Sequence, residues 1–412
     1  MTHAARPVHA PMDQFPVIDD CLVVGGVPLP ELARRVGRTP FYAYDRRLIS
    51  ERVELLRTHL PRQVHLHYAM KANPMPEVVA HLARLVDGLD VASAGELRIA
   101  LGAGARPGSI SFAGPGKTDA DLEAALVAGI VINLESEGEM ERLAALASRR
   151  GTRARVNVRV NPDFELKSSG MRMGGGPKPF GVDAERVPAM LRRIAAIALD
   201  FQGFHIFSGA QNLHADAIAE AQHKSVELAV RLAQDAPGPV RILNIGGGLG
   251  IPYFPGDERL DVTLVARNLA AVLEGLDSRL PGAQVVLELG RFLVAEAGIY
   301  VCRVIDRKIS RGHCFLVTDG GLHHHLAASG NFGQVIRKNY PVVVGNRVRG
   351  AKREIVSVVG PLCTPLDLLA DKMEMANAEA GDLIVVFQSG AYGLTASPGA
   401  FLSHPPAGEI LV

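Results

Sequence analysis

The chain is poor in cysteine, in excess charge of either sign and in long apolar runs. Its four cysteines lie far apart and form no C-x-x-C pair, which argues against a disulfide framework or a zinc site. The 44 basic residues balance 43 acidic ones, so nucleic acid is not expected as a partner. No apolar run could span a bilayer, and MTHAARPVHAPMDQF lacks a signal-peptide pattern. We therefore expect a cytoplasmic protein with no membrane segment and no metal.

The middle of the chain alternates short apolar strands with amphipathic helical stretches. Apolar positions recur at helical spacing in segments such as MPEVVAHLARLV and SEGEMERLAALASRRG. The strand-like runs are VHLHYAM, LDVAS, SISFAG, IVINLE, RARVNVRVN, DFQGFHIFSG, RILNIGGG and AQVVLELG. Eight strands over roughly 250 residues are typical of an α/β fold of the (β/α)8 TIM-barrel type, which we predict for residues 45–295. An open doubly wound sheet is the alternative, because the strand count alone does not exclude it.

The composition and the hydrophobic pattern of the sequence change after about residue 295. Runs such as GIYVCRVIDRKI, HCFLVTDGG and GDLIVVFQSGAYG are rich in β-branched residues and carry few helical patterns. They predict a β-rich domain over residues 296–412. Residues 1–44 are predicted to form a loose arm and a strand, from the stretch CLVVGGVPLPELARRVG, that joins this domain. A chain of 412 residues has room for two domains.

Several groups capable of chemistry stand at the predicted ends of barrel strands, where barrel enzymes carry their catalytic side chains. Lys71 ends the first strand, although a lone lysine there is most often simply solvated. Gly246–Gly248 let backbone N–H groups approach an anion such as phosphate, although a tight turn also uses glycine. Glu288 needs a cationic or hydrogen-bonding partner, which Arg291 could supply in place of a ligand. His205 could equally be a satisfied core histidine.

Taken together, these groups suit one cofactor. Pyridoxal 5'-phosphate needs an amine for covalent attachment, a cradle for its phosphate, a carboxylate at its ring nitrogen and a ring to stack on. Lys71, the triglycine segment, Glu288 and an aromatic side chain in GFHIFSGAQ supply one of each. The sequence therefore predicts a pyridoxal-phosphate enzyme.

The motifs occur in an order that resembles one family. HYAMKAN (67–73) is similar to the cofactor-lysine motif of the fold-type III pyridoxal-phosphate decarboxylases, which include diaminopimelate and ornithine decarboxylase. LDVASAGEL follows it at the expected distance. GGGLGIPY (246–253), ELGR (288–291), GPLCTPLD (360–367) and GAYG (390–393) resemble later elements of the diaminopimelate branch. The resemblance covers nearly the whole chain and implies an alanine racemase-like barrel with a β-rich domain.

The resemblance also implies roles for residues of the barrel. Lys71 would hold the cofactor covalently, and Glu288 would keep its pyridine nitrogen protonated. Gly246, Gly247 and Gly248, together with Arg291, would hold the phosphate.

Further roles fall to the β-rich domain. Cys363 and Tyr392 would complete the active site of a neighbouring subunit, which implies a homodimer. Cys363 would return a proton to the carbanion left after carbon dioxide departs. Asp367 matches an acidic residue that could help to bind the substrate amine.

The chain departs from the family pattern around the cofactor ring. Phe207 stands where the family has a stacking histidine, and it could still stack on the ring. Ala210 stands in place of a phosphate-binding serine, and Ser208 could supply the lost hydroxyl. His205 aligns with an earlier histidine and is expected near the substrate.

Two further departures concern the substrate. Thr364 replaces a glutamate that reads the amino group of diaminopimelate, and residues 319–334 lack an arginine found in that branch. A site without these polar partners disfavours diaminopimelate. The pattern is more similar to a side branch that decarboxylates an amino acid tethered to an acyl carrier protein. The alternatives are a diaminopimelate decarboxylase proper, a racemase of the same fold and a non-catalytic regulatory protein that binds the cofactor.

Overall fold

The computed structural model describes residues 7–165 and 171–412. The chain divides into two compact units. The first, here called the barrel unit, contains Arg52–Gly250 and Leu260–Gly290. The second, here called the β unit, contains Met1–Glu51, Ile251–Arg259 and Arg291–Val412. The β unit is thus assembled from three separate pieces of the chain.

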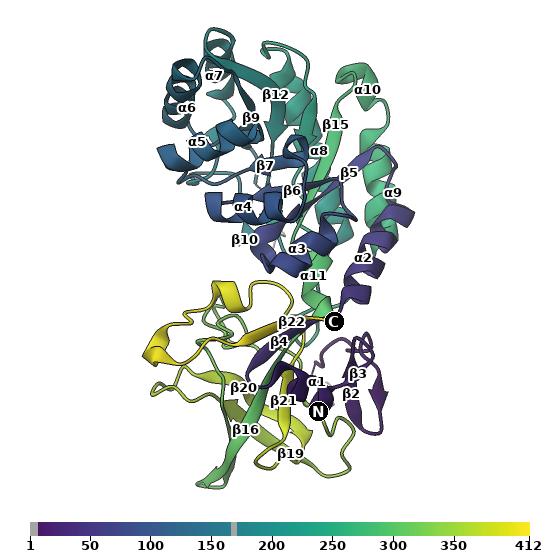
Figure 1. Ribbon diagram of the computed structural model, residues 1–412. Helices are drawn as coiled ribbons and strands as arrows, with labels where there is room; N and C mark the ends of the chain where they lie inside the picture. The colour runs from purple at the N-terminus through teal and green to yellow at the C-terminus, as the bar shows by residue number, and fades with distance from the viewer. Residues whose placement is uncertain (1–6, 166–170) are drawn as a thin grey trace. The chain divides into compact units, whose positions relative to one another are not determined.

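The barrel unit is a closed (β/α)8 barrel (Figure 1). Its strands are β5 (Val64–Ala69), β6 (Gly88–Val91), β7 (Ile110–Phe112), β8 (Val131–Leu134), β9 (Ala154–Asn161), β12 (Leu199–His205), β14 (Ile242–Asn244) and β15 (Gln284–Leu289). Among the described residues these eight strands run in parallel in the order β9-β12-β14-β15-β5-β6-β7-β8, and β8 pairs with β9 to close the ring. The strands coincide with the eight runs found in the sequence. The barrel prediction is therefore confirmed, and the open-sheet alternative is wrong.

Helices alternate with these strands. They are α3 (Pro76–Leu82), α4 (Ala94–Gly102), α5 (Asp119–Ala128), α6 (Glu137–Arg149), α7 (Val187–Ala195), α8 (Ala215–Ala233), α9 (Val262–Leu273) and α10 (Leu276–Arg279). Helix α2 (Arg46–His59) precedes β5. Short strands β10 (Met171–Arg172) and β13 (Gly209–Ala210) pair with each other, and β11 (Val182–Asp183) extends the sheet beside β9.

Three of the barrel helices begin with a serine or threonine cap of the same local pattern. The side-chain oxygens of Ser93, Thr118 and Ser136 each accept a hydrogen bond from the backbone N–H three residues later. At Thr118 the side chain of Asp121 returns a bond to the Thr118 backbone and completes a capping box. Such caps satisfy N–H groups that have no partner within the helix. The local sequence therefore fixes where these helices begin.

The inside of the barrel is polar. Inward-facing side chains on five successive strands are linked in a row: His67 donates to Asp90 (3.1 Å), Ser111 to Asp90 (2.5 Å), Asn133 to Ser111 (3.1 Å) and Asn157 to Asn133 (3.0 Å). Burial lowers the pKa of His67, but the carboxylates of Asp90, Glu288 and Asp87 together outweigh burial and raise that pKa. Because a buried polar group is costly unless it is paired, this row supports only one register of the strands.

The β unit contains two sheets. The larger has strands β4 (Phe41–Tyr44), β16 (Gly298–Ser310), β17 (His313–Thr318), β18 (Val342–Val344), β19 (Arg353–Val359), β20 (Leu368–Ala376), β21 (Leu383–Val386) and β22 (Gly408–Leu411). Its order is β18-β21-β16-β17-β19-β20, with β4 paired to both β16 and β22. The smaller sheet joins β1 (Val17–Ile18), β2 (Cys21–Val24) and β3 (Val27–Pro28), followed by α1 (Leu29–Val36). A short helix, α11 (Arg291–Val294), precedes β16.

The prediction of a β-rich second domain is confirmed. Residues 21–24 lie in the smaller sheet, whereas the N-terminal strand of the larger sheet is β4. The two sheets share one apolar core that includes Phe15, Leu22, Phe41 and Val301.

The remaining sequence expectations concern metals and membranes. All four cysteines are free. Within the described ranges, no group of three or more His, Cys, Asp or Glu side chains is placed to hold a metal ion. In the same ranges, no helix is both long enough and apolar enough to cross a membrane.

Candidate active site

Lys71 lies at the carboxyl end of a barrel strand. Strand β5 ends at Ala69, and Lys71 occupies the single 3-10 turn that follows, Met70–Ala72. The turn is held from both sides, because the Tyr68 hydroxyl donates to the Asn73 carbonyl (2.8 Å) and the Asn73 side chain accepts from Met75 N (3.1 Å). The amine of Lys71 is therefore delivered to the barrel mouth by a rigid turn.

Glu288 receives this amine. It lies near the end of β15, pairs in register with His67 of β5, and is buried. Lys71 Nζ lies 3.2 Å from Glu288 Oε1, and His205 Nε2 lies 3.1 Å from Glu288 Oε2. Burial would raise the pKa of Glu288, but the Lys71 ammonium and the His205 ring together hold it well below its usual range. Glu288 is thus an ionised carboxylate in a buried setting.

A cavity of about 520 Å³ opens beside Lys71 and Glu288. That volume suits a small ligand. Asp90, Lys117 and Arg159 also line it, and the last two are ion-paired with buried glutamates at 2.8 and 2.7 Å. Lys117 and Arg159 are buried in their ion pairs, whereas 45% of the Lys71 side chain is accessible to solvent.

The triglycine segment forms a tight loop after β14. Gly246 and Gly248 have φ angles of +70° and +76°, which favour glycine. A Cβ on Gly247 would lie 2.2 Å from the carbonyl oxygen of Glu288. The Asn244 side chain accepts from Gly246 N (2.8 Å), whereas the N–H groups of Gly247 and Gly248 form no hydrogen bond to any described residue. Two backbone donors are therefore available to an anion, as in other phosphate-binding loops.

Phe207 lies beside both the lysine and the loop. Lys71 Nζ is 5.7 Å from the centre of its ring, and a Cβ on Gly246 would lie 2.9 Å from its Cδ2 atom. The His205 ring stands edge-on to it, with centroids 6.5 Å apart. Ser208 is buried, and Ala210 lies in the short strand β13.

These residues fit pyridoxal 5'-phosphate. The site provides a primary amine, a buried ionised carboxylate, two unpaired loop amides and an aromatic ring, all within the barrel unit. Glu288 and its histidine suit a protonated pyridine nitrogen, and the loop amides suit a phosphate. The geometry therefore brings together four of the features expected from the sequence.

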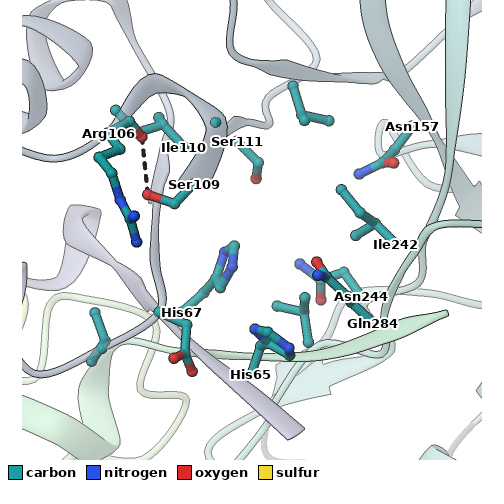
Figure 2. Close-up of a pocket in the computed structure, with 15 residues that line it drawn as sticks. His65, His67, Arg106, Ser109, Ile110, Ser111, Asn157, Ile242, Asn244 and Gln284 are labelled. Carbon is teal, nitrogen blue, oxygen red and sulfur yellow. Dashed lines mark hydrogen bonds between the residues drawn. The ribbon is translucent and has the colours of Figure 1, made fainter. Parts of the chain in front are cut away.

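A second cavity, of about 570 Å³, lies toward the amino ends of the barrel strands. It is lined by side chains near the amino ends of strands, including His65, Ile242 and Gln284 (Figure 2). Chemistry in (β/α)8 barrels takes place at the carboxyl ends of the strands, so this cavity is not the catalytic one. Its wall still matters, because Asn244, which faces it, also anchors the triglycine loop.

The β unit holds the other residues predicted from the sequence. Arg291 donates to the Tyr253 hydroxyl (2.8 Å), and its guanidinium lies 4.7 Å from the centre of the Tyr392 ring. Tyr392 has a positive φ of +53° and is half-buried. The three side chains form one cluster, in which an arginine is framed by two tyrosines.

The GPLCTPLD element lies in the same unit. Cys363 is exposed and Thr364 is half-buried. Asp367 is buried, and its two carboxylate oxygens accept from Leu322 N (2.6 Å) and Leu362 N (2.8 Å). These bonds join two loops of the β unit, so Asp367 already has a structural task.

Comparison with known proteins decides the family. Residues 46–295 match the family model described as pyridoxal-dependent decarboxylase, pyridoxal binding domain. The chain belongs to this family. It is a pyridoxal-phosphate-dependent decarboxylase of the fold-type III class, as the resemblance in the sequence implied.

Curated relatives of this decarboxylase have related activities. It is 38% identical to the L-glutamyl-[BtrI acyl-carrier protein] decarboxylase of Niallia circulans. The aligned 383 residues cover 90% of this chain and 88% of the relative. It is 34% identical over 397 residues to the diaminopimelate decarboxylase of Aquifex aeolicus, with 96% and 91% covered. The crystal structure of M. jannaschii diaminopimelate decarboxylase with L-lysine superposes with a TM-score of 0.88 at 25% identity, covering 97% and 93% of the two chains.

Sequence reasoning did not single out several side chains that lie close to the predicted site residues within each unit. Asp90 and Arg159 line the cavity, and Tyr253 holds Arg291. Each stands in a stretch that was recognised, namely LDVAS, RARVNVRVN and GGGLGIPY. For Asp90 and Arg159, their inward-facing positions on barrel strands were a usable signal, because period-2 alternation predicts which residues face the barrel axis.

Proposed function

We propose that this decarboxylase removes carbon dioxide from an amino acid carried as a thioester on an acyl carrier protein, with a glutamyl group as the first candidate. The observation that carries the proposal is the 38% identity, over 90% of the chain, to a relative named for that activity. The diaminopimelate decarboxylases that also match are less similar, at 34% identity and below.

The substrate-facing residues support the same choice. Residues 319–334 contain no arginine, and Thr364 stands in place of a glutamate. The next arginine along the chain, Arg337, already donates to the Ser329 and Leu368 carbonyls at 3.2 and 2.6 Å. A polar site rejects ligands that leave its buried groups unpaired, and this segment offers no lysine or arginine to the carboxylate of a distal amino acid end. A neutral thioester arm meets no such penalty.

Within the proposal, the residues divide the work. The cofactor supplies an electron sink for the bond to the departing carboxylate. Lys71 holds it, Glu288 keeps a proton at its ring nitrogen, and Phe207 stacks on the ring. Gly246–Gly248 hold its phosphate.

The remaining predicted residues come from the β unit and from the strand end beside Glu288. Arg291 and Tyr392 are proposed to bind the phosphate as well. Cys363 is proposed to return a proton to the substrate Cα. We propose that three side chains face the substrate: His205, Thr364 and Asp367. Asp367 would do so while both of its carboxylate oxygens accept backbone hydrogen bonds.

The test compares carrier-linked and free substrates. L-glutamyl-carrier protein thioester should lose carbon dioxide, detected by mass spectrometry of the intact carrier. Free glutamate, lysine, ornithine and meso-diaminopimelate should react at least about 100-fold more slowly in kcat/KM, as expected when binding energy from the carrier and its arm is missing. The Lys71→Ala variant with the same carrier is the control. Equal or faster turnover of free diaminopimelate would overturn the proposal.

We also propose that two copies of the chain share each active site. Cys363 is exposed, and nearby Leu366 has 59% of its surface accessible. A second copy that covers this segment would explain both exposures.

Mixing inactive variants tests the shared site. Lys71→Ala and Cys363→Ala dimers, unfolded and refolded together, should recover about a quarter of the wild-type activity, because half of the dimers carry one intact site. The matched control mixes Lys71→Ala with Glu288→Gln. Both lesions then lie in the barrel unit, and every mixed dimer has a defect in each site. No recovery in the first mixture would show that the site belongs to one chain.

A further inference from the structure

A buried polar cluster lies between helix α8 and the end of strand β12. Gln222 and Ser225 stand three residues apart on α8 and therefore on one face of it. Ser208 lies three residues after the end of β12. The exposed fractions of these residues are 2%, 1% and 8%, respectively, so all three are enclosed by protein.

None of these side chains has a partner in the part of the chain that the structure describes. Both polar atoms of the Gln222 amide and the hydroxyls of Ser225 and Ser208 form no hydrogen bond. Buried polar groups in native proteins are nearly always paired, with protein or with ordered water. Gln222 and Ser208 line the same cavity, and their unpaired polar atoms therefore indicate an occupant that binds there.

A small cavity joins this cluster to the triglycine loop. It measures about 20 Å³ and is lined by Ser208 and Gln222 on one side and by Gly247 and Gly248 on the other. A single water needs about 10–15 Å³ of such space, and a phosphate group needs several times more. The cavity therefore fits one water molecule and excludes the phosphate itself.

The walls of the cavity are fixed. Asn212 N donates to the Gly248 carbonyl (2.9 Å), and Gly250 N donates to the Asn212 carbonyl (2.9 Å). The segment after β12 and the triglycine loop are thus bonded to each other around the cavity. A water held there would keep a constant position relative to the free N–H groups of Gly247 and Gly248.

We propose that Gln222 is a phosphate-positioning residue. Its amide and the Ser208 hydroxyl hold one buried water beneath the triglycine loop, and this water hydrogen-bonds the phosphate of the cofactor. Ala210 has no hydroxyl to offer, so the donor comes from α8 through water. The inference rests on the cofactor and not on the substrate, so it can fail while the proposed carrier-linked activity holds.

The test uses two forms of the cofactor on cofactor-free protein. Pyridoxal 5'-phosphate and pyridoxal, which lacks the phosphate, are each titrated and their Kd values read from the visible absorbance of the bound form. In Gln222→Leu, the Kd of pyridoxal 5'-phosphate should rise about tenfold, the cost of one lost hydrogen bond to a charged group. The Kd of pyridoxal should not change. Gln222→Glu should weaken pyridoxal 5'-phosphate further by charge repulsion.

A matched control is available in the same barrel. Gln202 is also buried, at 3% exposure, but its amide donates to Asp200 at 2.7 Å near the amino end of β12. Gln202→Leu should leave the ratio of the two Kd values unchanged. If Gln222→Leu does not fold, Ser208→Ala tests the same water and should raise the same ratio.

Two results would overturn the inference. The first is an unchanged Kd for pyridoxal 5'-phosphate in Gln222→Leu. The second is an equal loss for both forms of the cofactor, which would mean that Gln222 only supports the fold. The ³¹P NMR resonance of the bound phosphate gives an independent reading and should move in Gln222→Leu but not in Gln202→Leu.

Discussion

Lys71→Ala is expected to give a colourless protein that releases no carbon dioxide. The variant loses the amine that attaches the cofactor, and with it the visible absorbance of the attached form. Turnover should fall by at least about 10³-fold. Loss of the ammonium 3.2 Å from Glu288 also removes a main cause of that carboxyl's lowered pKa, so the pKa should rise. Absorbance spectra and carbon dioxide release measure the effect.

Lys224 is a close match for a control. Its ammonium is 2.6 Å from Glu220 and 5.5 Å from the Phe164 ring centre, similar to the carboxylate and phenylalanine neighbours of Lys71. Lys224→Ala should keep both the colour and the activity. A yellow, active Lys71→Ala protein would refute the assignment of Lys71 as the attachment site.

Glu288→Gln is expected to leave the cofactor bound but nearly inert. A neutral amide of the same shape no longer raises the pKa of the pyridine nitrogen, so the ring accepts electrons poorly. We expect kcat to fall by roughly 10²–10⁴-fold. The pH titration of the bound cofactor's absorbance should also shift, because its protonated form loses an anionic partner. A spectrum and a kcat like those of the wild type would contradict the role given to Glu288.

Glu139 serves as the control for loss of a buried carboxylate. It pairs with Lys117 at 2.8 Å, and both side chains are almost fully buried. Glu139→Gln leaves the Lys117 charge without its partner and should cost about 3–5 kcal/mol in the free energy of unfolding. Because the Lys117 charge itself stays in the cavity wall and Glu288 is intact, the absorbance of the bound cofactor should shift much less than in Glu288→Gln. The comparison separates a general loss of stability from a specific change at the cofactor.

The barrel and much of its site could be predicted because their signals are local. The alternation in VHLHYAM and the cap pattern of Ser93, Thr118 and Ser136 mark where strands and helices begin and end. In (β/α)8 enzymes the active site lies at the carboxyl ends of the strands, so a prediction of those ends also predicts the location of the site. Lys71 and Glu288 were therefore found without knowledge of their 3.2 Å separation.

Features that depend on distant pairings could not be read from the sequence. Strand β20, in the stretch LLADKMEMA, carries three charged residues and becomes a strand by pairing with β19. Strand β22 lies beside β4, more than 360 residues earlier in the chain. Gln222 is likewise an ordinary polar residue in a helical pattern. Only the packing of α8 against the barrel shows that its amide is buried without a hydrogen-bond partner among the described residues. These outcomes come from tertiary context, which overrides local propensity.

At Ile251–Arg259 the chain leaves the barrel unit, contributes nine residues to the β unit and then returns to the barrel unit. This crossing determines which contacts a truncated chain would keep. Gly256 N donates to the Val8 carbonyl (2.9 Å), Arg259 pairs with Asp13, and the Tyr253 and Tyr340 rings lie 4.7 Å apart. A fragment that ends near residue 295 would keep these nine residues but lose part of their partners. Its buried Tyr253 would then face water. No single proteolytic cut can free the barrel cleanly, and gene fragments that split the chain at one point would yield a barrel with an orphaned, aggregation-prone segment.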